Sequence, residues 1–270
     1  MEVLAHRVFW SLAFLLAILA VRRQWAWLRA VAGQPRVLGA FLASAILLSI
    51  NWITYIWSVN NGHVVDASLG YFMTPLVSVA LGYTVLKERL RRLQWIALGL
   101  AVLGVVWLTM QAGRLPWIAL VLASSFGVYG LLRKVAVLGP LEGLTLETLI
   151  LAPPAALAVF WLASHGQAAF PTGDTATDWW LVGVGPTTAA PLLLFAAGAR
   201  RLSLVTLGVL QYLSPTLQFM LGVWVFHEPF APARLVGFGL IWAALILYTV
   251  DGWRTSRRAG LAVAATPQIN

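Results

Sequence analysis

The sequence contains no cysteine and few charged residues. Among its 270 residues, 10% are charged and nine are Asp or Glu. The lack of Cys excludes disulfides, thiolate metal ligands and cysteine nucleophiles. Soluble domains carry about 25% charged residues. In contrast, 60% of this chain is hydrophobic and its mean hydropathy is +0.84, which predicts an integral membrane protein.

Catalytic and nucleotide-binding signatures are absent as well. The sequence has no G-x-x-x-x-G-K-[ST], H-E-x-x-H or G-x-S-x-G segment. Its histidines are too dispersed to indicate a zinc site; they are His6, His63, His165 and His227. The formal net charge of +9 comes from short basic clusters between apolar segments, which indicates membrane orientation rather than nucleic-acid binding. We therefore predict no catalytic residue, no cofactor and no metal site, and we do not expect an enzyme.

Nine apolar segments are long enough to span a bilayer. About 20 helical residues, rising ~1.5 Å each, cross ~30 Å of hydrocarbon. The predicted spans are residues 2–21, 36–59, 66–85, 93–111, 115–136, 141–164, 178–197, 204–226 and 231–250. The predicted fold class is an all-α membrane protein with nine transmembrane helices. Residues 251–270, basic and then small and polar, are predicted to be a disordered tail.

The basic residues lie mainly in alternate loops. Those that follow the odd-numbered spans are Arg22, Arg23, Arg29, Arg36, Lys87, Arg89, Arg91, Arg92, Arg133, Lys134, Arg200, Arg201, Arg254, Arg257 and Arg258. Loops rich in Lys and Arg stay in the cytoplasm. The pattern predicts that these loops and the C-terminus are cytoplasmic.

An internal repeat with an offset of 140 positions (215 − 75) relates the two halves. The recurring pairs are Thr74-Pro75 with Ser214-Pro215, Leu81-Gly82 with Leu221-Gly222, and Glu88 with Glu228. This offset places the counterpart of residues 115–136 before the first residue. We expect a repeat of five spans, with a first copy at 1–111 that lacks its first helix and a complete second copy at 115–250. An odd number of crossings gives the copies opposite orientations, an arrangement typical of secondary transporters.

Polar residues and prolines within the spans are the candidate substrate-cavity residues. Matched prolines in inverted halves indicate a transport site, because each proline leaves a backbone carbonyl without its helical partner. The candidates are Asn51, Tyr55, Tyr71, Pro75, Tyr129, Thr187, Thr188, Gln211, Tyr212 and Pro215. The alternative is that they serve only helix packing, through kinks and hydrogen bonds between helices.

Two charged residues lie inside spans, Arg7 and Glu147. A charge within the membrane indicates function by default, and Glu147 is a candidate for a coupling proton. The alternatives are a buried structural charge or a side chain that reaches the interface. The repeat offset makes the two positions equivalent, which places them in opposite leaflets, so we do not expect a direct salt bridge between them.

Segments in both halves match the pattern of a known family. Those in the first half are Glu2 with His6-Arg7, Asn51-Trp52, Ala67-Ser68-Leu69-Gly70-Tyr71-Phe72, Pro75-Leu76 and Glu88-Arg89. Those in the second half are Tyr129-Gly130-Leu131, Arg133-Lys134, Glu147-Thr148, Gln211-Tyr212 and Pro215-Thr216. In these segments the sequence resembles the RarD proteins, which belong to the EamA type of the drug/metabolite transporter superfamily. The resemblance implies ten spans in two inverted five-helix halves in the bacterial inner membrane. It also implies a central cavity whose walls here include the second, third, fifth, seventh and eighth predicted spans.

These observations favour a secondary transporter of small organic solutes, such as drugs or metabolites, that works by alternating access. One alternative is a membrane-embedded enzyme acting on a lipid, although its carboxylates would have to be clustered and the nine acidic residues here are dispersed. Another is a fragment without transport activity, because the missing helix is one wall of the cavity. The expected partners are a small-molecule substrate and the lipid bilayer, and the sequence does not predict an oligomeric state.

Overall fold

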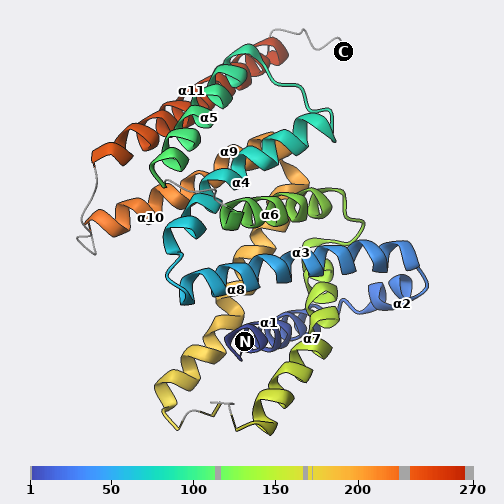
Figure 1. Ribbon diagram of the computed structural model, residues 1–270. Coiled ribbons are helices and arrows are strands. Elements are labelled where there is room, and N and C mark those ends of the chain that lie inside the picture. Colours follow the sequence, from blue (N-terminus) through green and yellow to red (C-terminus); the bar gives the residue numbers. More distant parts are fainter. Residues whose placement is uncertain (1, 113–116, 167–169, 172, 225–231, 265–270) are drawn as a thin grey trace, which may run out of the picture. The chain divides into compact units, whose positions relative to one another are not determined.

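The computed structural model (Figure 1) describes all residues except 1, 113–116, 167–169, 172, 225–231 and 265–270. The regular secondary structure of these residues is entirely helical. Eleven helices and no strand are found in these residues. The helices are α1 Glu2–Arg22, α2 Ala26–Ala32, α3 Pro35–Asn60, α4 Val64–Thr84, α5 Arg92–Ala112, α6 Trp117–Val135, α7 Pro140–Ser164, α8 Thr175–Arg201, α9 Leu204–Gln211, α10 Leu213–Trp224 and α11 Pro232–Ala264.

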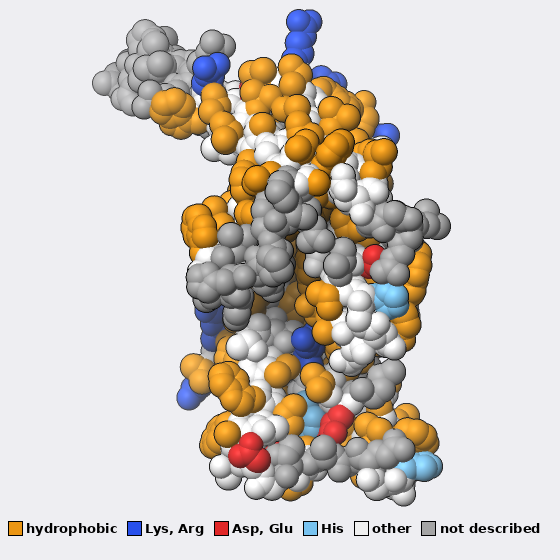
Figure 2. Space-filling model, turned by 60° about the vertical axis from the view of Figure 1, so that its left-hand side comes forward, with side chains coloured by type: hydrophobic (Ala, Val, Ile, Leu, Met, Phe, Trp, Pro, Cys, Tyr) orange, Lys and Arg blue, Asp and Glu red, His pale blue; other side chains and the backbone are white. Residues whose placement is uncertain are grey.

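Seven of the described helices are long and apolar enough to cross a membrane. They are α1, α3, α5, α6, α7, α8 and the part of α11 from Leu235 to Thr255. Leu204–Leu217 is a shorter apolar segment. On the face shown in Figure 2, orange apolar side chains cover much of the described surface and Lys and Arg side chains are few. The prediction of an all-α, multi-pass membrane protein is confirmed.

The ends of the predicted spans agree with the helices to within a few residues, with three differences. The short helix α2 was not predicted, and the span 204–226 is divided into α9 and α10. The helix α11 continues to Ala264, beyond residue 251, where the predicted tail begins. An ion pair of 2.6 Å between Arg91 and the buried Asp251 holds the beginning of this extension. Residues 265–270 lie outside the described residues.

The helices form two compact units. The first unit comprises Met1–Ile56 and Val128–Leu202, and the second comprises Trp57–Gly127 and Ser203–Asn270. Each unit takes helices from both halves of the sequence: α1 and α7 lie in the first, α4 and α9 in the second. The compact units therefore do not coincide with the two sequence repeats predicted at 1–111 and 115–250.

In the first unit, α1 packs along α7 and α8. The hydroxyl of Ser11 donates to the backbone oxygen of Gly185 at 3.1 Å, and a Cβ at Gly185 would lie 2.5 Å from the backbone oxygen of Trp10. Small residues permit such close approach between membrane helices. The helix α8 begins at Thr175 because Asp174 caps it, accepting from the backbone N–H groups of residues 176 and 177 at 3.2 Å. Hydrogen bonds from the Thr177 hydroxyl and from these N–H groups lower the pKa of Asp174.

The last turn of α6 ties together the ends of the two helices that follow it. The ammonium group of Lys134 donates to the backbone oxygens of Ala199 at 3.3 Å and Leu202 at 2.5 Å, at the C-terminal end of α8. A cation there satisfies carbonyls that have no partner within the helix and complements the helix dipole. Arg133, the preceding residue, donates to the backbone oxygen of Pro140 at the beginning of α7.

In the second unit, α5 packs along α11 and α4 packs against α5 and α9. Its core contains Phe72, Phe238 and Ile241. The axes of α5 and α11 approach closely where Gly104 meets Gly237: a Cβ on Gly104 would lie 2.8 Å from the Gly237 carbonyl oxygen. The carboxylate of Glu88 accepts hydrogen bonds from the first two N–H groups of α9, at 2.7 and 2.9 Å.

Candidate functional site

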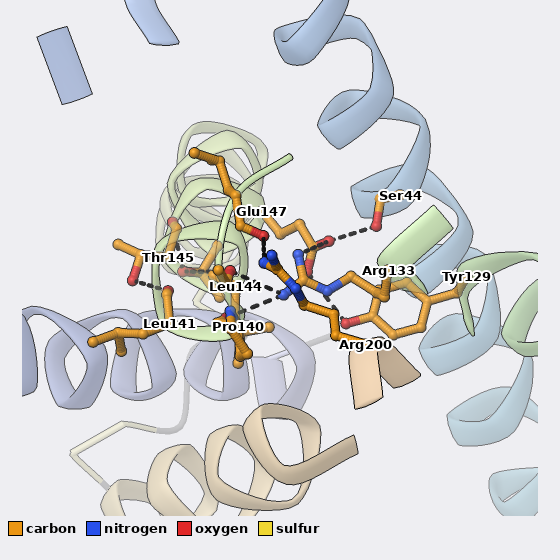
Figure 3. A network of polar contacts seen from close by, with 12 residues as sticks. Ser44, Tyr129, Arg133, Pro140, Leu141, Leu144, Thr145, Glu147 and Arg200 are labelled. Atoms are coloured by element: carbon orange, nitrogen blue, oxygen red, sulfur yellow. Dashed lines mark hydrogen bonds and ion pairs between the residues drawn. The ribbon is translucent and has the colours of Figure 1, made fainter. Parts of the chain in front are cut away.

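A fully buried carboxylate, Glu147 of α7, is the centre of a polar cluster in the first unit (Figure 3). Ser44 of α3 donates to its Oε1 at 2.5 Å, and Tyr129 of α6 donates to its Oε2 at 3.3 Å. Three helices thus meet at one acidic side chain. A buried carboxylate requires such hydrogen bonds together with a counter-charge.

The counter-charge is Arg133 of α6, which is 1% exposed. Its Nη1 lies 3.5 Å from Oε1 of Glu147, and its Nη2 donates to the backbone oxygens of Pro140 at 3.1 Å and Gly139 at 3.5 Å. The guanidinium also lies over the ring of Phe41, 5.5 Å from its centroid. Gly143 faces this group without a side chain, since a Cβ there would overlap with Nη1 of Arg133 and lie 2.7 Å from the Phe41 ring.

Sequence reasoning singled out Glu147 and Tyr129 but missed Ser44 and Arg133. The charge pattern places Arg133 among the basic residues that mark a cytoplasmic loop, whereas the structure places it in the last turn of α6 with its side chain buried. The signal that was present is the short connection between Val135 and Pro140. It keeps the end of α6 close to the beginning of α7, and a long Arg side chain near the turn can then reach a carboxylate two turns into α7.

Arg7, paired with Glu147 in the sequence analysis, has another neighbour. Its guanidinium carbon lies 5.3 Å from the centroid of the Trp52 ring, a cation–π contact between α1 and α3. The ion pair of Glu147 among the described residues is made with Arg133.

A cavity of about 180 Å³ lies beside the cluster, between α3 and α6. Arg36, Phe41, Ser44 and Arg133 contribute to its wall, and the other lining residues are Ala, Val and Leu. None of the lining residues is acidic. The cavity therefore combines apolar walls with two guanidinium groups.

In the second unit, the helical path is interrupted at Tyr212, between α9 and α10. Pro215 explains the interruption, because a proline has no N–H group to donate to the carbonyl four residues earlier, which belongs to Gln211. The side-chain amide of Gln211 and the hydroxyl of Tyr212 are buried without a hydrogen-bond partner among the described residues. Tyr212 also lines a small cavity of about 20 Å³, which is room for one water.

The predicted cavity residues are divided between the units. Those in the first unit are Asn51, Tyr55, Tyr129, Thr187 and Thr188, and those in the second are Tyr71, Pro75, Gln211, Tyr212 and Pro215. Asn51, Tyr55 and Thr188 are half-buried, and Tyr71 is 36% exposed. Thr187 is exposed and its hydroxyl donates within α8 to the Gly183 oxygen at 2.8 Å. Pro75 is buried against α9, because a Cβ on Gly208 would lie 2.9 Å from the Pro75 carbonyl oxygen.

The apolar helices are those of a multi-pass membrane protein. Residues 1–110 match the EamA-like transporter family, which makes the class a membrane transporter. Over 270 residues the chain is 50% identical to "Protein RarD" of Streptomyces exfoliatus, covering 99% of this chain and 85% of the relative. It is 33% identical over 265 residues to "Chloramphenicol-sensitive protein RarD" of Pseudomonas aeruginosa, covering 95% and 86%. The chain belongs to the RarD proteins of the EamA-like transporter family.

A solved crystal structure of a protein with 19% sequence identity shares the fold. Its TM-score is 0.69, and the match covers 94% of this chain and 88% of that chain. At this identity the likeness concerns the arrangement of helices alone.

Proposed function

We propose that this protein is a secondary transporter in the bacterial inner membrane that moves small organic solutes by alternating access of two inverted halves. Membership of the EamA-like transporter family supports transport. We infer the solute class, the mechanism and the membrane from the helix repeat, the buried polar groups and the basic helix ends.

The beginnings of corresponding helices support the inverted repeat. The helices α3, α4 and α5 begin at Pro35, Val64 and Arg92, and α8, α9 and α11 begin at Thr175, Leu204 and Pro232. Each pair differs by 140 positions, as in 175 − 35. Three equal offsets in helix starts, together with the recurring residues, favour two copies of one unit that crosses the membrane five times. The first copy holds four of these spans in this chain (α1, α3, α4 and α5) and the second holds five, so we infer nine spans.

We infer the position of the transport site from the helix interruption at Tyr212. Interrupted helices place backbone and side-chain polar groups at substrate sites of secondary transporters. Pro215 removes the helical partner of the Gln211 carbonyl, and Pro75 does the same to Tyr71 at the equivalent repeat position. The Gln211 amide is buried and without a partner among the described residues. A buried amide in this state costs about 1–3 kcal/mol, which a solute with both a donor and an acceptor would offset.

The Glu147 cluster is the proposed coupling site. It holds a buried carboxylate with hydroxyl donors on both oxygens and a cation at 3.5 Å. Ionisable residues inside a membrane commonly serve proton relays. A proton gradient is therefore expected to drive solute flux, and Glu147→Gln is expected to remove that dependence.

Flux into proteoliposomes tests the transport site. Chloramphenicol is the first probe, because it appears in the name of one relative, followed by a panel of small amphipathic solutes with and without a proton gradient. Gln211→Ala should lower flux about tenfold, the effect of ~1.4 kcal/mol, and Pro215→Ala should lower it by restoring the helix. Gln111→Ala, at an exposed Gln in the last turn of α5, is the matched control. Equal flux in the Gln211 and Gln111 variants would exclude this site.

The basic ends of the helices support a cytoplasmic C-terminus, through the positive-inside rule. Arg22, Arg36, Arg133 and Arg200 lie at helix ends in the first unit. A reporter protein that fluoresces only in the cytoplasm, fused after residue 270, should be fluorescent. A reporter active only in the periplasm should be inactive at the same position.

A further inference from the structure

The guanidinium of Arg133 is under-satisfied. Nη2 makes two backbone hydrogen bonds. Nε has no acceptor among the described residues, and Nη1 has the Glu147 oxygen at 3.5 Å but no hydrogen bond. Arginine has five N–H donors in a fixed planar fork and cannot lose its charge. Each buried donor that stays unpaired costs free energy, so the protein gains if an oxygen atom enters.

The cavity beside Arg133 provides the place for that oxygen. Its volume is about 180 Å³, and Arg133 is part of its wall. Arg36, an exposed residue in the first turn of α3, lies on the same wall. Arg36 adds a second positive charge to the wall, and the carboxylate of Glu147, which pairs with Nη1 of Arg133 at 3.5 Å, is not among the lining residues.

The position of the cavity fits the surface of a bilayer. It is formed by the first turns of α3 and by the last turns and end of α6, and ends of membrane-spanning helices lie near the headgroups. Further arginines of the first unit lie at other helix ends, namely Arg22, Arg29, Arg200 and Arg201. Basic pockets between helices on the cytoplasmic side bind the headgroups of anionic lipids.

We propose that the cavity between α3 and α6 is an oxyanion site that takes a phosphate or carboxylate group, with Arg133 and Arg36 as its donors. The group comes from an anionic phospholipid headgroup or from a free anion in solution. In either case the oxyanion lies against the guanidinium groups of Arg133 and Arg36, and pairing with Nε or Nη1 of Arg133, which are buried here, requires that side chain to turn toward the cavity. Phe41 and the aliphatic residues line the rest of the cavity. The lining residues do not include Gln211 or Tyr212, but Arg133 and Ser44 are also partners of Glu147, the proposed coupling residue.

Thermal unfolding of the purified full-length chain in detergent tests the site. The probes are phosphatidylglycerol against phosphatidylcholine, and sodium phosphate against sodium chloride at equal ionic strength. If phosphatidylglycerol raises the Tm and sodium phosphate does not, the ligand is a lipid headgroup. If sodium phosphate also raises the Tm, the site accepts a free oxyanion. Both results support the site. No rise with either probe overturns it.

Two variants connect the effect to this cavity. Arg36→Gln removes the exposed donor and should weaken the apparent affinity about tenfold, with Arg29→Gln, an exposed arginine on α2 that does not line the cavity, as the control. Ala40→Leu places a side chain in the cavity without changing charge and should abolish the rise in Tm. If Arg36→Gln behaves like Arg29→Gln and Ala40→Leu behaves like the unmodified chain, the effect is general surface attraction and the proposal fails.

Discussion

The hydroxyl of Ser44 and the carboxylate of Glu147, 103 positions apart, are joined by a hydrogen bond of 2.5 Å that connects α3 to α7. Both side chains are buried. With Tyr129 and Arg133 they form a polar cluster inside an otherwise apolar helical unit. In surroundings of low polarity, such a cluster stabilises the fold only while each member retains its partners.

Glu147→Gln should therefore be strongly destabilising. The amide keeps the size of the side chain, but it leaves the charge of Arg133 buried without a counter-ion, a loss of roughly 3–5 kcal/mol. Unfolding in denaturing detergent, followed by circular dichroism, measures it. Glu142→Gln, in the first turn of the same helix, is the control and should change stability little. The double variant Glu147→Gln with Arg133→Met should recover part of the loss, and simple additivity would contradict the ion pair.

Gly143→Ala should also destabilise the first unit, because its Cβ would overlap with the Arg133 guanidinium and approach the Phe41 ring. Overpacking of this kind costs about 1–3 kcal/mol. Gly183→Ala on α8, where a Cβ meets nothing within 4 Å, should be neutral or slightly stabilising, since Ala has the higher helix propensity. A loss of thermal stability at Gly183 equal to that at Gly143 would argue against the packing explanation.

The contact of α5 with α11 offers a test with adjacent controls. A Cβ on Gly237 would lie 2.6 Å from Cγ of Leu108, whereas one on Gly239 meets nothing within 4 Å. Gly237→Leu should force the helices apart and lower the Tm, while Gly239→Leu should leave it unchanged. If both variants unfold at the same temperature, the two helices do not pack through this glycine.

Glu88→Gln should loosen the beginning of α9. The carboxylate accepts from the N–H groups of Leu204 and Val205, and an acidic cap is worth about 0.5–2 kcal/mol. Hydrogen exchange of these two amides should become faster, while the N–H groups of Ala176 and Thr177, capped by Asp174, should exchange as before. Unchanged exchange at Leu204 and Val205 would show that Glu88 is not their cap.

Apolar run length was sufficient to predict most helix limits, because crossing hydrocarbon imposes one length on every span. The division of the span at Tyr212 was harder to predict from the sequence. Both prolines of the repeat remove a backbone bond, yet α4 remains continuous through Pro75 while the path breaks before Pro215. The proline is shared, but the first copy has Tyr71, Phe72 and Thr74 where the second has Gln211, Tyr212 and Ser214. The proline alone therefore does not predict the break.

The polar cluster could be predicted only in part. A charge within a span identified Glu147, since such a charge is costly in lipid. Ser44 carries no such signal, because single hydroxyls are common in membrane helices and usually bond within their own helix, as Thr145 does with the Leu141 oxygen at 2.8 Å. Its role depends on which helices are neighbours, and this is a property of the tertiary fold.

The adjacent residues Arg133 and Lys134 give the end of α6 a mechanical role. One holds the beginning of α7 through the Pro140 oxygen, and the other holds the end of α8 through the Ala199 and Leu202 oxygens. Arg200 adds a bond of 2.5 Å from α8 to the backbone oxygen of Leu138, in the turn between α6 and α7. A rotation of α6 about its axis would therefore also move the beginning of α7 and the end of α8, so the three helix ends would move together.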